Sequence, residues 1–335
     1  MQNGLVSILT PCYNTGKLVH RLLDSVLMQD YPQVEMFCID DGSSDNTREV
    51  VESYIPKFVE KGYTLIYVYK ENGGQSVAVN NGLKLVNGEY LMWPDSDDYY
   101  IEKTAISQFV IAFNQHPRAS VVRCYSRFVN EETLEEISRI IDTPVHHRTD
   151  LFEDSVFCSN GFYWGAGNYM VRMSALDAAI QNREIYTEKS AGQNWQMIMP
   201  LLFKQECITI TDYFHNILMR VASHSRGQFA GYDKTIEKQD VYRRTILGTI
   251  QRMPLMTEEE KRRYSNKVEA HYLHVKMQVS VNYGKAQEAV SYMNEEVKLT
   301  GVKYPVINAL ICKYCDCKPF FVMLRAIRKL FKIPV

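Results

Sequence analysis

The stretch VSILTPCYN, residues 6–14, begins a pattern that decides the fold: a short apolar run followed by a polar cluster. The pattern recurs in three further segments, MFCIDDGSSD (36–45), TLIYVYKENGGQ (64–75) and YLMWPDSDD (90–98). Helical patterns lie between the apolar runs, so strand and helix alternate about every 30 residues, which is typical of βαβ units. The sequence therefore predicts an α/β fold with a doubly wound, mainly parallel sheet flanked by helices.

The polar clusters after the four apolar runs are expected to lie together. Ligands of such sheets bind beyond the carboxyl ends of the strands, and each cluster directly follows a predicted strand. Further along, the helical period dominates residues 232–299. We therefore predict a first domain over 1–230 that carries the site, and a helical C-terminal subdomain over 231–335.

Composition excludes several classes of protein. The 335 residues contain 38 Lys and Arg against 39 Asp and Glu, a net charge of −1, which argues against binding nucleic acid through bulk charge. Eight cysteines are spread along the chain, unlike a secreted disulfide framework, so a cytoplasmic location is expected. We find no charged leader before an apolar stretch and no apolar window of membrane-spanning length, so neither a signal peptide nor a spanning helix is expected.

Three carboxylates, Asp95, Asp97 and Asp98, lie within four residues directly after an apolar run. Carboxylates this close repel each other unless a cation intervenes. Oxygen ligands suit a hard divalent ion, Mg²⁺ or Mn²⁺, which also binds substrate phosphates. The alternative is a solvated acidic turn that caps the next helix.

Asp40 and Asp41 follow the second predicted strand. An aspartate here can accept hydrogen bonds from a ribose or a base, although the same residues also suit a turn with a helix N-cap. Neither a Gly-x-Gly-x-x-Gly fingerprint nor a phosphate loop ending in Gly-Lys-Ser/Thr follows the first strand. A diphosphate would therefore be held mainly by metal.

In order and spacing, the four motifs together resemble inverting glycosyltransferase family 2 with the GT-A fold, of the bacterial polysaccharide type. The resemblance is strong over residues 4–100, weaker to about residue 230 and absent beyond. It implies transfer of a sugar from a nucleotide-diphosphate sugar, most often UDP-linked, with inversion at the anomeric carbon. The acceptor would be a glycan or a lipid-linked glycan in surface polysaccharide synthesis, and residues 1–230 would form the catalytic domain that binds the nucleotide sugar.

The resemblance also implies roles for particular residues. Asp95 and Asp97 match the Asp-x-Asp that holds ribose and metal, Asp98 can take part, and His224 is a candidate third metal ligand. The flanking Arg220 and Arg226 are candidate phosphate clamps, while His224 could equally be a solvated loop residue. The positions that match nucleotide-binding residues of the family are Thr10, Pro11, Tyr13, Asp40, Asn72, Gly73 and Asp95.

The chain departs from the family at the catalytic base. Where the family carries Glu-Asp before an Arg-Trp-like pair, this chain has Gln193 and Asn194 before Trp195. Amides cannot accept a proton at neutral pH, so we take Glu188 as the first candidate base, ahead of Glu184 and Asp212. Gln193 and Asn194 could instead bind substrate hydroxyls.

Two other functions remain open from the sequence. A non-catalytic protein that binds nucleotide sugars or carbohydrates would also explain the amide pair. A sugar-phosphate nucleotidyltransferase would need a glycine-rich basic loop after the first strand, which residues 11–14 lack.

The C-terminal segment 318–335 is basic and amphipathic. Such a helix can lie in a membrane surface, which would suit a lipid-linked acceptor and a peripheral position at the inner face of the membrane. Packing on the helical subdomain or on a partner chain is the alternative. Cys312, Cys315 and Cys317 lack a second ligand pair, so they give only a weak zinc signal.

Overall fold

The computed structural model describes residues 1–163, 165–220 and 231–330. His224 and Arg226, expected to hold metal and phosphate, lie outside the described residues. The structure divides into two compact units: Met1–Val221 with Gln251–Leu255, and Ala222–Ile250 with Met256–Val335. None of the described helices is long and apolar enough to cross a membrane.

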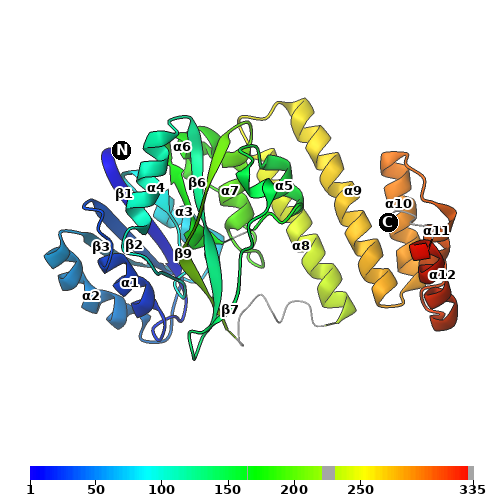
Figure 1. Cartoon of the computed structure of the whole chain (residues 1–335), viewed down its shortest axis with the longest axis horizontal. Helices are drawn as coiled ribbons and strands as arrows, with labels where there is room; N and C mark the ends of the chain where they lie inside the picture. The colour runs from blue at the N-terminus through cyan, green and yellow to red at the C-terminus, as the bar shows by residue number, and fades with distance from the viewer. Residues whose placement is uncertain (164, 221–230, 331–335) are drawn as a thin grey trace. The chain divides into compact units, whose positions relative to one another are not determined.

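The elements follow each other along the chain as Figure 1 labels them. The strands are β1 (Gln2–Cys12), β2 (Val34–Asp40), β3 (Thr64–Tyr69), β4 (Gly88–Met92), β5 (Tyr99–Tyr100), β6 (Ala119–Asn130), β7 (Glu136–Arg139), β8 (Tyr169–Arg172) and β9 (Glu206–Met219). The helices of the first unit are α1 (Val19–Leu27), α2 (Thr47–Lys61), α3 (Gln75–Leu83), α4 (Ala105–Gln115), α5 (Phe152–Phe157), α6 (Met173–Ala179) and α7 (Asn194–Leu202). Five helices follow: α8 (Tyr232–Gln251), α9 (Glu258–Asn282), α10 (Ala286–Thr300), α11 (Val306–Lys313) and α12 (Lys318–Leu330).

One mixed sheet organises the first unit, with the strand order β3-β2-β1-β4-β8-β6-β9-β5 and β7 paired to β6. The first four strands run parallel, as do β6 and β9, while β8, β7 and β5 are antiparallel to their neighbours. The predicted α/β fold with a C-terminal helical extension is confirmed. β1 continues through Pro11 to Cys12, because its pairing with β2 extends to Asp40.

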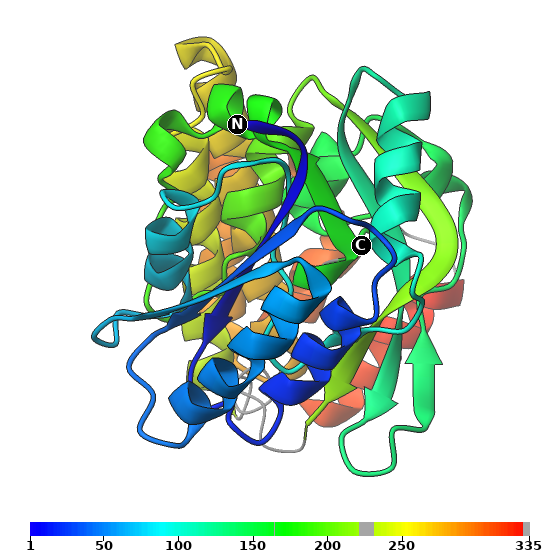
Figure 2. The ribbon, with the colours of Figure 1, turned by 90° about the vertical axis from the view of Figure 1, so that its left-hand side faces the viewer.

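Helices cover both faces of the sheet (Figure 2). The apolar sides of α1, α2 and α4 share one core with alternate strand residues such as Val6 and Ile8. On the opposite face α3 packs so closely on β1 that a Cβ at Gly82 would lie 2.0 Å from Leu9 Cδ1. The sheet is therefore buried on both sides, and its strand ends are left to carry the site.

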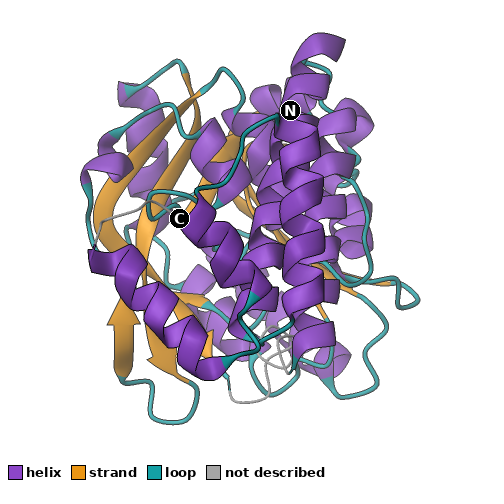
Figure 3. Cartoon of the chain, turned by 90° about the vertical axis from the view of Figure 1, so that its right-hand side faces the viewer, coloured by secondary structure: helices purple, strands orange, loops and turns teal. Residues whose placement is uncertain are grey.

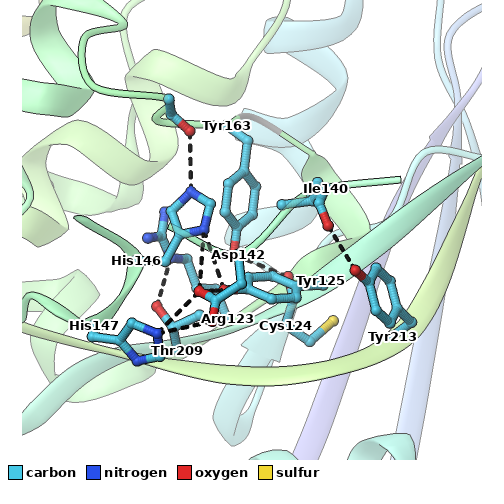
Figure 4. A network of polar contacts seen from close by, with 11 residues as sticks. Arg123, Cys124, Tyr125, Ile140, Asp142, His146, His147, Tyr163, Thr209 and Tyr213 are labelled. Carbon is cyan, nitrogen blue, oxygen red and sulfur yellow. Dashed lines mark hydrogen bonds and ion pairs between the residues drawn. The ribbon is translucent and has the colours of Figure 1, made fainter. Parts of the chain in front are cut away.

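A buried polar network fixes the segment after β7 against β6 (Figure 4). The Tyr125 hydroxyl donates to Asp142 Oδ1 over 2.6 Å and lies 3.2 Å from His146 Nδ1. Arg123, fully buried, donates from Nε to Thr209 Oγ1 over 3.0 Å and lies 4.4 Å from the Tyr163 ring centroid. Burial lowers the pKa of His146, so this histidine favours its neutral form.

The C-terminal helices pack on one another (Figure 3), and their buried side chains form a core of their own. In this part of the second unit α10 packs on α9, α11 on α10 and α12 on α11. A capping box at Thr257 and Glu260 starts α9, because both side chains bond backbone N–H groups that the first turn leaves open. Leu324 is the residue of α12 that is buried in the shared core.

Candidate active site

The loops that follow β1, β2, β3 and β4 meet at one edge of the sheet, as the sequence predicts. The Asn14 N–H donates to Ser43 Oγ over 2.8 Å, which joins the first two loops. Asp41 joins the second loop to the third, and Gln75 Nε2 donates to Asp95 Oδ1 over 2.7 Å, which joins the third to the fourth. Four separate segments of the chain thus build one site.

Asp41 holds the glycine loop in place. Its buried carboxylate accepts the N–H of Gly73 over 2.9 Å and the N–H of Gly74 over 2.7 Å, and it pairs with Lys70. Gly42 lies close behind, because a Cβ there would be 2.9 Å from the backbone nitrogen of Asn72. The sequence alone does not distinguish the role of Asp41 from that of its neighbour Asp40.

We expect Asp41→Ala to lower the free energy of unfolding by about 2 kcal/mol, since it leaves two N–H groups and the Lys70 ammonium without their acceptor. Urea denaturation measures this, and hydrogen exchange should be faster at Gly73 and Gly74. Asp41→Asn, which keeps one acceptor oxygen, should lose less. Unchanged exchange at both glycines in Asp41→Ala would contradict the assignment.

The predicted nucleoside contacts differ in their accessibility. Tyr13 is 50% exposed, whereas Thr10 and Pro11 are buried in β1. Asp40 is 1% exposed; its oxygens accept the Ser43 N–H over 2.7 Å and the Tyr67 hydroxyl over 2.6 Å. The Asp40 carboxylate thus supports the loop from beneath, and its predicted contact with the nucleotide stays a prediction.

Asp95 lies at the centre of the site. Its Oδ1 accepts the side-chain amides of Gln75, over 2.7 Å, and Gln193, over 3.1 Å. Burial, reinforced by the charge of Asp97, raises the pKa of Asp95 to about 7. The raised pKa means that the ionised form of Asp95 is disfavoured, and a bound cation would stabilise that form.

Asp97 and Asp98 have different partners. Asp97 pairs with Arg220 over 2.9 Å, and Arg220 also lies 3.9 Å from Glu131. Asp98 is buried; it accepts the backbone N–H of Leu218 over 2.9 Å, and burial followed by the charge of Asp97 raises its pKa well above the usual range. Asp98 therefore anchors the end of β9, which in turn places Arg220 beside Asp97.

The donor set of this turn fits a divalent cation. Among residues 1–163, 165–220 and 231–330 no group of three or more His, Cys, Asp or Glu side chains is placed to hold a metal ion. Mg²⁺ commonly takes only one or two carboxylates and completes its shell with water and substrate phosphates. Asp95 and Asp97 supply such a pair, and a cation there would offset both the burial and the charge of Asp97 that raise the pKa of Asp95.

The amides predicted at the position of the base fall at the site. Gln193 is 1% exposed and donates to Asp95, while its Oε1 has no hydrogen-bond partner among the described residues. Asn194 begins α7. Trp195 donates from Nε1 to the Ser155 carbonyl over 3.0 Å, so its indole N–H is bound to α5.

Glu188 lies in the segment that leads to Gln193. Next to it, Lys189 approaches the glycine loop: a Cβ at Gly74 would be 3.6 Å from Lys189 Cα. Glu188 Oε1 accepts the Ser190 hydroxyl over 3.3 Å. The segment thus borders the site, and the role of Glu188 as base stays a prediction.

The sequence places Gln75 in a polar cluster expected at this edge but predicts no role for it alone, and it gives no indication of His215. Gln75 follows Gly74 at the start of a predicted helix, a position where a polar side chain is ordinary. His215 is fully buried on β9 with Nε2 3.9 Å from Asp98 Oδ2, and burial lowers its pKa to about 3. A buried histidine inside a strand gives no local signal of its own, because its partners come from β5 and β6.

Known proteins resemble this chain in sequence and in fold. Residues 7–180, just over half of the chain, match the model of glycosyl transferase family 2. An uncharacterized glycosyltransferase of Rickettsia typhi is 33% identical over 129 residues, 38% of each chain. The poly-beta-1,6-N-acetyl-D-glucosamine synthase of Staphylococcus epidermidis is 33% identical over 130 residues, 38% of this chain and 30% of that protein. The matches thus span only about a third of these relatives' length.

Among solved structures, the fold is similar to S. aureus TarS 1–349 in complex with UDP-GlcNAc, with a TM-score of 0.64 at 16% identity over 97% of this chain and 92% of that chain. It is also similar to the mannosyltransferase PcManGT from Pyrobaculum calidifontis in complex with GDP-Man and Mn²⁺, with a TM-score of 0.52 at 15% identity over 98% and 88%. At this identity the likeness concerns the fold alone. The family match over residues 7–180 shows that the chain belongs to glycosyl transferase family 2.

Proposed function

We propose that this chain is an inverting glycosyltransferase that moves a sugar from a nucleotide-diphosphate sugar, UDP-linked, to a glycan or lipid-linked glycan acceptor in surface polysaccharide synthesis. The observation that carries the proposal is the position of Asp95 and Asp97 at the end of β4, beside the glycine loop that Asp41 holds. The solved relatives with UDP-GlcNAc and with GDP-Man and Mn²⁺ support a nucleotide-sugar donor.

The proposed donor site uses the loops after β1, β2 and β3. Tyr13 at the exposed rim would contact the nucleoside, with Thr10, Pro11 and Asp40 supporting the loop beneath it. Asn72 and Gly73 would border the nucleotide, and Asp95 would bind its ribose. The Gly73 N–H is already held by Asp41, so this loop is ordered before the donor arrives.

Asp95 and Asp97 would hold Mg²⁺ or Mn²⁺, with His224 as a further proposed ligand. Bound there, the cation would neutralise the charge that develops on the leaving diphosphate. Arg220 pairs with Asp97, and its guanidinium would also help to neutralise the charge of the diphosphate.

At the acceptor side, the free Oε1 of Gln193 would accept a hydrogen bond from a substrate hydroxyl, and Asn194 would do the same from the start of α7. Neither amide can take the proton that the attacking hydroxyl loses. Glu188 would accept it, which requires its segment to bring the carboxylate to the acceptor.

The amide pair also favours a second candidate, a degenerate protein that binds nucleotide sugars or carbohydrates without transferring them. Thermal-shift screening against nucleotide sugars, with and without Mn²⁺, tests both functions. We expect a UDP-sugar to raise the melting temperature only when Mn²⁺ is present. Stabilisation without turnover or donor hydrolysis would favour the binding protein, and no response to any nucleotide sugar would overturn both.

The acceptor and the location complete the proposal. A lipid-linked acceptor would place the protein in the cytoplasm at the inner face of the membrane. The similarity to a poly-beta-1,6-N-acetyl-D-glucosamine synthase supports a role in polysaccharide synthesis.

A further inference from the structure

The last helix of the second unit, α12, has two distinct faces. Leu324 is buried, and Phe320, Phe321, Ile327 and Arg328 lie half-buried around it, so one face packs on the core formed with α9 and α11. The opposite face bears large apolar side chains: Val322 is 64% exposed, Met323 45% and Leu330 77%. An apolar face that residues 231–330 leave uncovered needs an explanation.

The exposed residues of α12 separate into two strips. At 3.6 residues per turn, the apolar residues cover about 100° of the helix circumference. This apolar strip consists of Pro319, Val322, Met323, Ala326 and Leu330. Beside it runs a basic strip of Lys318, Arg325 and Lys329. The helix contains no acidic residue, so the charge of this surface is of one sign.

A small, open hollow lies next to the basic strip, between α9, α11 and α12. Arg325 and Arg328 of α12 line it together with Gln278 and Asn282 of α9 and Asn308 of α11. Guanidinium groups with neighbouring amides form the donor set that binds a phosphate group. The hollow is thus suited to an anionic headgroup at the edge of an apolar surface.

We propose that α12 docks this protein on the surface of a bilayer that contains anionic lipids. In this arrangement the apolar strip enters the boundary between headgroups and acyl chains, and the basic strip faces lipid phosphates. The Arg325–Arg328 hollow receives one headgroup phosphate. The role of this docking rests on the proposed function, because docking would bring the transferase to a lipid-linked acceptor.

Charge decides between the occupants of this face. In a two-fold dimer whose α12 helices run antiparallel, the basic strips of both copies would lie on the same side of the contact, and like charges at close range are unfavourable. An anionic lipid surface offers the opposite charge and an apolar layer at the same time. The surrounding sequence strengthens the case: residues 301–335 contain seven Lys and Arg and a single acidic residue, Asp316.

Co-sedimentation of the full chain with vesicles tests the proposal. We expect binding to phosphatidylcholine vesicles that contain phosphatidylglycerol, weak binding to phosphatidylcholine alone, and release at high salt. Arg325→Gln with Arg328→Gln should lower the partition coefficient about 25-fold, at roughly fivefold per charge. Val322→Ser with Leu330→Ser should also reduce binding, by loss of buried apolar area.

The matched control is Lys57→Gln with Lys61→Gln, which removes the same charge from the exposed face of α2 and should bind vesicles as the natural chain does. Equal binding to neutral vesicles, or no effect of the α12 variants, would overturn the proposal. So would self-association without vesicle binding that Val322→Ser with Leu330→Ser abolishes, because a second copy would then cover the strip. Thermal shifts with UDP-sugars, measured on the same samples, report separately on the proposed function.

Discussion

Replacing Asp97 with asparagine is expected to lower the rate of sugar transfer about 1000-fold while the protein stays folded. The asparagine has the same shape, and the side chain of Asp97 is 24% exposed, so the fold should tolerate it. What disappears is the negative charge that would hold the cation opposite the leaving diphosphate. Transfer rate at saturating donor and the affinity for Mn²⁺, measured by calorimetry, should fall together.

A loss of activity in Asp97→Asn would not come from a protonated Asp95. The charge of Asp97 helps to raise the pKa of Asp95, so its removal leaves Asp95 more readily ionised. Asp233→Asn, on the exposed side of α8, alters net charge equally and should keep full activity. Natural rates and natural Mn²⁺ affinity in Asp97→Asn would show that the cation is held elsewhere.

Gly167→Ala should lower the free energy of unfolding by about 3 kcal/mol. A Cβ at this position would lie 2.1 Å from His215 Nε2. The imidazole cannot move away freely: it is fully buried, 3.3 Å from Ser126 Oγ and 5.5 Å from the Tyr100 ring centroid. Thermal or urea unfolding of the purified chain measures the loss.

Two further variants show whether the clash is the cause. Gly192→Ala is the control, since only Gln75 Oε1 lies within 4 Å of its added Cβ, at 3.6 Å, and it should unfold like the natural chain. Adding His215→Ala to Gly167→Ala should recover part of the loss relative to His215→Ala alone. If the two substitutions were strictly additive, the contact would not explain the destabilisation.

The sequence predicts the first hundred residues well, because each strand is an apolar run and each helix has an apolar side. The apolar run that begins at Thr64 is β3, and the polar cluster that follows it leads into α3, which begins at Gln75. The convergence of the loops follows from the parallel order of these strands. Local pattern and overall topology agree here, which is what makes the inference possible.

The different contacts that the site residues make could not be predicted from the sequence. Asp40 and Asp41 are equivalent as letters, yet one bonds Tyr67 and the other the glycine loop. The contact between Gln193 and Asp95 joins residues 98 positions apart, and no local period encodes such a pairing. His215 owes its place to β5 and β6, which the chain brings beside β9 only after folding.

The buried support beneath Tyr13 has a consequence for redesign. Asp40, Thr10 and Pro11 are buried. A substitution at any of them that altered selectivity would therefore also lower the stability of the fold. Tyr13 is exposed, whereas Asn14 bonds the second loop, so a library confined to position 13 can explore the preference for the proposed nucleotide base on a scaffold that remains intact.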